Sequence, residues 1–90
     1  MKYFAAFLPM LDEEKSRTIR PRHVAFLDEQ DSRGRIFARG PFTDASGGLV
    51  IYIASSLEEA QEIAGSDPYV TDGARRLELH EWAMKTRPAA

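Results

Sequence analysis

The run Leu49–Ala54 is aliphatic or aromatic at every position, so the strand it predicts has no polar face to present to water. Its β-branched and aromatic side chains favour extended backbone. Residues 2–9 carry aromatic and aliphatic side chains on both parities, and predict a second strand that is buried on both faces. A sheet built on these two strands needs cover on both sides, and this requirement constrains the fold more than any other feature.

The chain has limited material to meet that requirement. Its 90 residues suffice for one domain, and 43% hydrophobic with 29% charged residues is an ordinary globular mixture. A chain of this length buries only about 60–65% of the surface that it exposes when unfolded. Association with a second copy is therefore an expectation from the start.

Composition also excludes several kinds of chemistry. The absence of cysteine excludes disulfides, iron–sulfur clusters, thiolate nucleophiles and cysteine-ligated zinc, and two histidines exclude a three-histidine zinc site. Twelve basic against fourteen acidic residues argue against a nucleic-acid partner. No apolar run reaches the roughly 18 residues of a membrane span. We predict a cytoplasmic protein with no membrane partner, no cofactor and no bound metal.

Caps, proline and glycine positions divide the rest of the chain. Pro21 suits the first turn of a helix, which is expected to end near Arg33 before Gly34, while residues 12–20 form a loop or a frayed helix start. Ser56 and Glu59 form a capping box. The other expected elements are a strand over 35–42, a turn over 43–48, a helix over 57–64, a short turn after Asp67, a strand over 75–84 and a tail over 85–90.

This order is β-α-β-β-α-β, the ferredoxin-like arrangement of α+β proteins. Two helices can cover only one face of a four-stranded sheet, yet both faces carry aromatic side chains such as Tyr3, Tyr52 and Trp82. An uncovered apolar face of that size usually marks an interface. We therefore expect one domain over residues 1–84 that forms a homodimer through its sheet face, as a dimeric α+β barrel.

His23 is the first candidate for chemistry. It shares the apolar stripe of the first helix with Ile19, Phe26 and Leu27, provided that the helix includes Ile19. An inward histidine in a small domain is more often a hydrogen-bonded core residue. The alternative is a general acid or base, because an imidazole exchanges protons readily at neutral pH.

Asp67 is the second candidate. An aspartate before a proline is a standard helix N-cap, which explains Asp67 and Pro68 without any further role. The functional interpretation is a carboxylate that orients His23 and stabilises its protonated form. The two residues are far apart in sequence, so spacing cannot pair them.

Other candidate sites are weaker. The arginines of the first half suit a solvated surface, but Arg20, one turn before His23, could hold an anionic ligand. His80 is expected at an interface because Trp82 lies two positions on. A serine triad is rejected because no serine lies in a nucleophile elbow, and a metal site with His23 and Asp67 has no supporting spacing. The glycines do not form a phosphate-binding pattern.

Seven short stretches, taken in order, resemble the YCII-related (YciI-like) family of small dimeric α+β proteins. They are Met1–Phe4, Arg20–Leu27, Gly34, Gly40–Phe42, Gly47–Gly48, Ser56–Ala60 and Asp67–Tyr69. The resemblance spans residues 1–82. It implies a ferredoxin-like fold, a dimer of the α+β-barrel kind and an active-site pair, which would be His23 and Asp67. Some relatives act in aromatic degradation, including dechlorination-type elimination.

Two functions follow as hypotheses. The first is a small cofactor-independent lyase or isomerase in which His23 and Asp67 act as general acid and base on a small aromatic or enolic substrate. Its expected substrate-binding residues are Arg20, Phe26, Phe42 and Tyr69. The second is a non-catalytic dimeric module that binds a small ligand in the same pocket. An assembly domain without a pocket is a third, simpler possibility.

Overall fold

The structure, a computed structural model, describes residues 1–87; the last three residues of the tail expected at 85–90 lie outside the described part. Four strands and three helices follow one another along the chain. They are β1 (Lys2–Pro9), α1 (Glu13–Ser32), β2 (Ile36–Pro41), β3 (Gly47–Ala54), α2 (Leu57–Gly65), α3 (Pro68–Thr71) and β4 (Glu78–Trp82).

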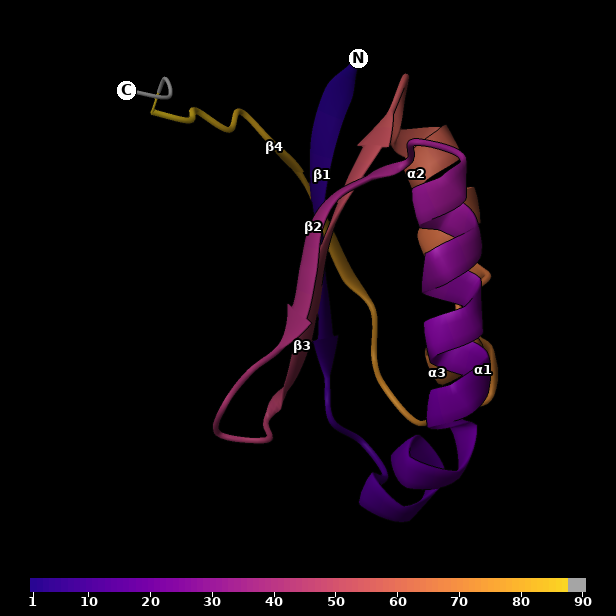
Figure 1. The fold of residues 1–90 in the computed structure, drawn as a ribbon. Coiled ribbons are helices and arrows are strands. Elements are labelled where there is room, and N and C mark those ends of the chain that lie inside the picture. Colours follow the sequence, from indigo (N-terminus) through magenta and orange to yellow (C-terminus); the bar gives the residue numbers. More distant parts are fainter. Residues whose placement is uncertain (88–90) are drawn as a thin grey trace.

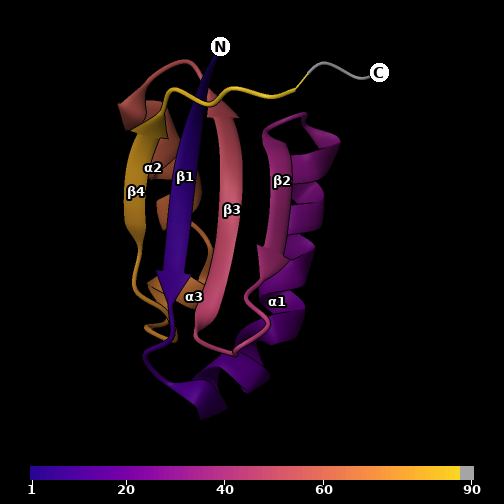
Figure 2. The ribbon, with the colours of Figure 1, turned by 90° about the vertical axis from the view of Figure 1, so that its left-hand side faces the viewer.

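The four strands form one antiparallel sheet in the order β2-β3-β1-β4. All three helices lie on one side of it (Figure 1). Figure 2 looks onto the opposite side, where the strands are in front and the helices behind. The molecule is therefore a two-layer α+β structure with one sheet face covered and the other open.

Helix α1 begins earlier than the sequence analysis expected. Its N-cap is Asp12, which accepts a hydrogen bond from the Lys15 backbone N–H at 2.9 Å, and Pro21 lies inside the helix. Of the two alternatives for residues 12–20, the helix start is the one observed, and Pro21 does not mark the first turn because proline is tolerated within a helix at the cost of a bend. The first turns of α1, at the bottom of Figure 1, run at an angle to the rest. The longer helix places Ile19 and His23 on one continuous face.

Strand β2 and helix α2 agree with the expected bounds to within one residue, whereas β4 is shorter than the strand expected over 75–84 and the turn expected after Asp67 is the short helix α3. The Ser56 side chain caps α2 by accepting from the Glu59 N–H at 3.1 Å, but the Glu59 carboxylate reaches back to Ser55 rather than to Ser56. Strand β3 begins two residues earlier than expected, at Gly47. Gly47 has a φ of 151°, and a Cβ there would lie 2.3 Å from the Leu8 carbonyl oxygen. Only glycine fits this close approach.

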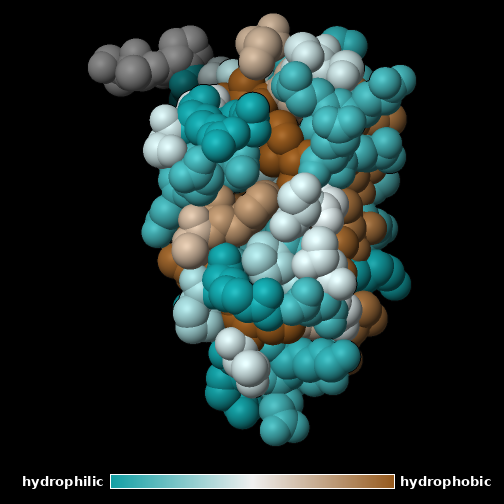
Figure 3. Space-filling view, turned by 90° about the vertical axis from the view of Figure 1, so that its right-hand side faces the viewer, coloured by the Kyte–Doolittle hydropathy of each residue, from teal (hydrophilic) through white to brown (hydrophobic). Residues whose placement is uncertain are grey.

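The hydrophobic core fills the space between the sheet and the helices. Alternate residues of β1 and β3 contribute Phe4, Tyr52 and their neighbours, and helix residues close over them, including Leu27 and Ile63. The outer surface of the helices is mostly hydrophilic (Figure 3). The amphipathic layers expected from the sequence are thus present on this side.

The open face of the sheet is apolar. Phe37, Phe42 and Trp82 are between 37% and 48% exposed. Aromatic contacts link Tyr3 to Phe37, and Phe7 to Phe42 and His80. This face carries Tyr3, Trp82 and His80, whereas Tyr52 lies in the core on the covered face. Among residues 1–87, no helix has the length and apolar character to cross a membrane.

Candidate active site

Helix α1 positions His23 on the side that faces the sheet. Ile19 and Leu27 lie one turn before and one turn after it, and both are 5% exposed. The imidazole itself remains 12% exposed because it lines a cavity between α1 and the sheet. His23 is therefore inward-facing and yet accessible to a small molecule.

Asp67 both caps α3 and pairs with His23. Its Oδ1 accepts a hydrogen bond from the Tyr69 backbone N–H at 2.9 Å, which makes it the N-cap of the helix. The His23 Nδ1 lies 2.8 Å from Oδ1 and 2.9 Å from Oδ2. The Asp67 side chain is almost completely buried, at 1% exposed. The cap and the histidine partner, weighed as alternatives on the sequence, are the same carboxylate.

The pairing determines which ring nitrogen is available. An imidazole that donates from Nδ1 to a carboxylate has Nε2 left to accept or donate a proton elsewhere. The hydrogen bonds to the buried carboxylate also fix the orientation of the ring. This arrangement has the geometry of a general acid–base pair.

Tyr69 is stacked on the imidazole. The two ring centroids are 3.8 Å apart and the planes are inclined by 18°. The Arg75 guanidinium carbon lies 4.3 Å from the same Tyr69 centroid. Two groups cannot both approach one face of a ring so closely without overlap, so Tyr69 is held between His23 and Arg75.

The cavity has a volume of about 250 Å³. Its helical wall comes from α1 and α3, and its floor is the row of facing sheet residues Leu8, Gly48 and Pro41. Gly48 has no side chain at the centre of that row. A Cβ at this position would lie 3.1 Å from the Gly40 carbonyl oxygen and 3.8 Å from the Arg75 Nη1, so a larger residue would crowd this part of the floor.

The structure brings together four of the six residues that the sequence analysis assigned to the site. Arg20 and Tyr69 line the cavity beside His23, and Asp67, which does not itself line the cavity, is hydrogen-bonded to the Nδ1 of the His23 ring. Phe26 and Phe42 do not line it. Phe26 packs against the hydrophobic core, and Phe42 follows β2 on the open face of the sheet, where it contacts Phe7.

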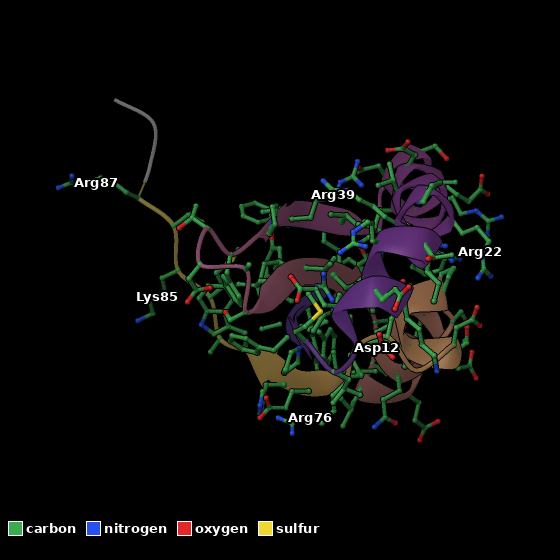
Figure 4. All side chains as sticks on the ribbon, turned by 90° about the horizontal axis from the view of Figure 1, so that it is seen from below. Asp12, Arg22, Arg39, Arg76, Lys85 and Arg87 are labelled. Atoms are coloured by element: carbon green, nitrogen blue, oxygen red, sulfur yellow. The ribbon has the colours of Figure 1, made fainter. Side chains whose placement is uncertain are left out.

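Two arginines that the sequence analysis did not assign to the site also line the cavity: Arg39 and Arg75. Figure 4, seen from below, shows Arg39 between β2 and α1, whereas Arg22 points away from the sheet. Arg75 precedes β4, and its only strand-like pairing is an isolated bridge with Met10. Neither arginine has a sequence pattern that predicts a role.

Burial perturbs one titratable group near the site. Tyr52 is 1% exposed on the covered face of β3. Its burial raises the pKa of the phenol above the ordinary value; the negative charge of Asp67 raises it further and Arg39 opposes the shift. The Tyr52 hydroxyl therefore stays protonated.

No metal site is assigned. In the part of the chain that the structure describes, no three histidine, aspartate or glutamate side chains gather closely enough to hold an ion. The second histidine, His80, lies opposite Ala5 in the sheet and lines a separate hollow of about 350 Å³ on the open face with Phe7 and Trp82. It is remote from the site described here, because it lies on the other side of the sheet.

Comparison with protein-family models gives a match over residues 1–83 to the YCII-related domain. The uncharacterized protein YjpA of Bacillus subtilis (strain 168) is 39% identical over 83 residues, which cover 92% of this chain and 98% of YjpA. Protein YciI of Escherichia coli O6:H1 is 36% identical over 70 residues, covering 67% of this chain and 71% of YciI.

A solved structure with a similar fold is 5-chloro-2-hydroxyhydroquinone dehydrochlorinase (TftG) from Burkholderia phenoliruptrix AC1100, in complex with 2,5-dihydroxybenzoquinone. The TM-score is 0.78, and the match covers 92% of this chain and 95% of TftG. Sequence identity is 19%, so the likeness concerns the fold.

Proposed function

Since the chain belongs to the YCII-related domain family, we propose that its cavity is the active site of a small cofactor-independent enzyme of the lyase or isomerase type. His23 moves a proton to or from the substrate through Nε2. Asp67 fixes the tautomer of the ring and stabilises its charged form. Arg20 and Tyr69 contribute to substrate binding.

One observation carries this proposal. The His23 Nδ1 lies within 2.9 Å of both oxygens of a buried carboxylate, and the same imidazole lines a cavity. A core histidine would need a hydrogen-bond partner but no cavity. A ligand pocket alone would need a cavity but no oriented imidazole.

The substrate class proposed is a small, flat aromatic or enolic molecule. A volume of about 250 Å³ suits a single ring, and Tyr69, whose two faces are covered by His23 and Arg75, lines that space with its edge. The dehydrochlorinase of similar fold binds a compound of this kind. In such a reaction, His23 removes a proton from a ring carbon or hydroxyl, and the electron pair left behind forms a new double bond. In an elimination, a leaving group such as chloride departs with its bonding pair; in an isomerisation, the displaced electron pair takes up a proton at another atom of the substrate.

We propose that the fold is ferredoxin-like. We also propose that the active form is a homodimer, in which the open sheet faces of two copies pack together as a dimeric α+β barrel. The exposed Phe37, Phe42 and Trp82 support it, because a monomer rarely leaves an apolar patch of that extent in water. Sedimentation at micromolar concentration tests it. We expect the wild-type protein to sediment as a dimer and the Phe37→Lys variant as a monomer. A wild-type monomer would contradict the proposal.

The catalytic proposal is tested with substrates and two variants. Wild-type protein is incubated in deuterated water with 5-chloro-2-hydroxyhydroquinone and a set of enolisable hydroxyquinones, while chloride release and deuterium incorporation are followed. Loss of a general acid or base lowers turnover by about 10²–10⁴-fold. A loss in this range is expected for His23→Gln, and a comparable or smaller loss for Asp67→Asn.

The same experiment separates the enzyme from a binding module. Unchanged turnover in His23→Gln would show that the reaction does not use the imidazole. Wild-type protein that binds these compounds without converting any of them, with equal affinity in His23→Gln, would instead favour the non-catalytic ligand-binding module.

A further inference from the structure

The three arginines that line the cavity differ in how their charges are balanced. Arg39 is paired with two carboxylates of α1, at 2.8 Å from Asp28 and 2.9 Å from Asp31. Arg20 is exposed on α1, where water screens its charge. Arg75 is partly buried, so water screens it less than Arg20, and among residues 1–87 it has no carboxylate partner of the kind that Arg39 has.

Neutral groups hold Arg75 in place. Its Nε donates to the hydroxyl of Ser16 at 3.0 Å, and its Nη1 donates to the Leu8 carbonyl at 3.4 Å. Ser16 is itself 4% exposed. The face of the guanidinium rests on the Tyr69 ring. The side chain is therefore fixed in position without any opposing charge from these partners.

Within residues 1–87, no carboxylate lies within 4.0 Å of the Arg75 guanidinium. A partly buried cation without a counter-charge is costly, and a bound anion relieves that cost. The guanidinium fork suits the oxygens of a carboxylate, phenolate or enolate. A Cβ placed on Gly48 would lie 3.8 Å from Nη1, so glycine at this point of the cavity floor keeps a side chain from packing against the guanidinium.

We infer that Arg75 binds the anionic group of the substrate. The inference rests on the proposed use of this cavity and specifies its substrate further as a small planar anion. Tyr69 lies between the imidazole and the guanidinium. The substrate therefore places its charged oxygen at Arg75 and its reacting atom at His23, along the edge of the tyrosine ring.

The test is the difference in affinity between anions and matched neutral compounds, measured by NMR titration. The probes are benzoate with benzamide, and 2,5-dihydroxybenzoquinone with its dimethyl ether. A hydrogen bond to a charged group contributes about 1.5–3 kcal/mol, which corresponds to a factor of roughly 10 to 150. Wild-type protein should prefer the anion of at least one pair by about tenfold or more, and Arg75→Gln should remove that preference while the neutral compound binds unchanged.

Two further variants make the outcome decisive. Arg75→Lys keeps the charge and the aliphatic stem but loses the fork, so the folded protein should retain part of the preference. Arg17→Gln, an exposed arginine of α1 outside the cavity, should change nothing. A wild-type protein without anion preference would overturn the inference, as would Arg75 variants that keep the full preference or lose both members of a pair equally.

The binding measurement does not depend on turnover. His23→Gln should keep the anion preference, since the imidazole is on the opposite side of Tyr69 from Arg75. A protein that prefers anions through Arg75 but converts no substrate contradicts the proposed reaction alone. Turnover that survives Arg75→Gln with an unchanged KM contradicts the role of Arg75 alone.

Discussion

Tyr69 and His23 are stacked face to face, with 3.8 Å between their centroids, and Arg75 covers the opposite face of the tyrosine. The aromatic ring thus fixes both the group proposed to move protons and the group proposed to hold charge. Because α3 is only four residues long, the position of Tyr69 depends on the cap that starts this helix.

Replacement of Tyr69 by leucine should destabilise the protein while replacement by phenylalanine should not. Leucine keeps much of the apolar volume but loses the flat ring, and aromatic stacking and cation–π contacts contribute about 1–3 kcal/mol together. We expect a loss in that range for Tyr69→Leu, measured by urea unfolding. Equal stability of the leucine and phenylalanine variants would show that only apolar volume matters at this position.

Asp67→Ala should cost more stability than Asp67→Asn. Alanine removes the helix cap and leaves the Tyr69 N–H and the His23 ring without their acceptor, at an expected cost of about 2–4 kcal/mol. Asparagine can still accept from Tyr69 through its side-chain oxygen, although it presents an N–H₂ or an uncharged oxygen to the imidazole. Chemical denaturation of the two variants measures the difference, and the reverse order would contradict the capping role.

The raised pKa of Tyr52 predicts loss of stability in alkali. The unfolded chain releases the phenol proton near pH 10, its ordinary pKa, whereas the folded chain retains it because burial and the Asp67 charge disfavour ionisation. The free energy of unfolding should therefore fall above about pH 10, by up to about 1.4 kcal/mol per pH unit from this group. Tyr52→Phe should show a shallower fall over the same range. Parallel curves for the two proteins would contradict the prediction.

Neutralising the partners of Arg39 should strengthen anion binding. In the double variant Asp28→Asn with Asp31→Asn, the Arg39 charge loses both of its carboxylate partners while it still lines the cavity. Benzoate should bind several-fold more tightly than to the wild type, while benzamide binds equally. Since these bridges are largely exposed, the change in stability should stay below about 1 kcal/mol. A benzoate affinity that does not rise would place the bound anion beyond the reach of Arg39.

The parts of the fold that were predicted correctly are those set by local sequence. The apolar run Leu49–Ala54 and the cap at Ser56 indicate a strand and a helix whatever surrounds them, and both are present. The start of α1 was left open between a loop and a frayed helix start, although Asp12 and the two glutamates after it form a typical helix N-terminus. Pro21 was given more weight than this signal, because proline at a first turn is so common.

The residues of the site could be brought together only in part from local sequence. His23 could be assigned to an inward helix face from periodicity alone, but 44 positions separate it from Asp67, and the family resemblance rather than spacing suggested the pair. Phe26 and Phe42 were expected in the pocket because they are aromatic, and packing placed them elsewhere. Arg75 has no periodic context, and only the tertiary structure places it against Tyr69.

The contact between α1 and the cap of α3 ties the first third of the chain to the last. A fragment ending at Ala54 would contain β1, α1, β2 and β3 and would keep the histidine, yet it would lack the carboxylate, the tyrosine and Arg75. A chain that ends before Arg75 therefore lacks part of the proposed centre, and chemistry of the proposed kind needs the last third of the chain as well as the first.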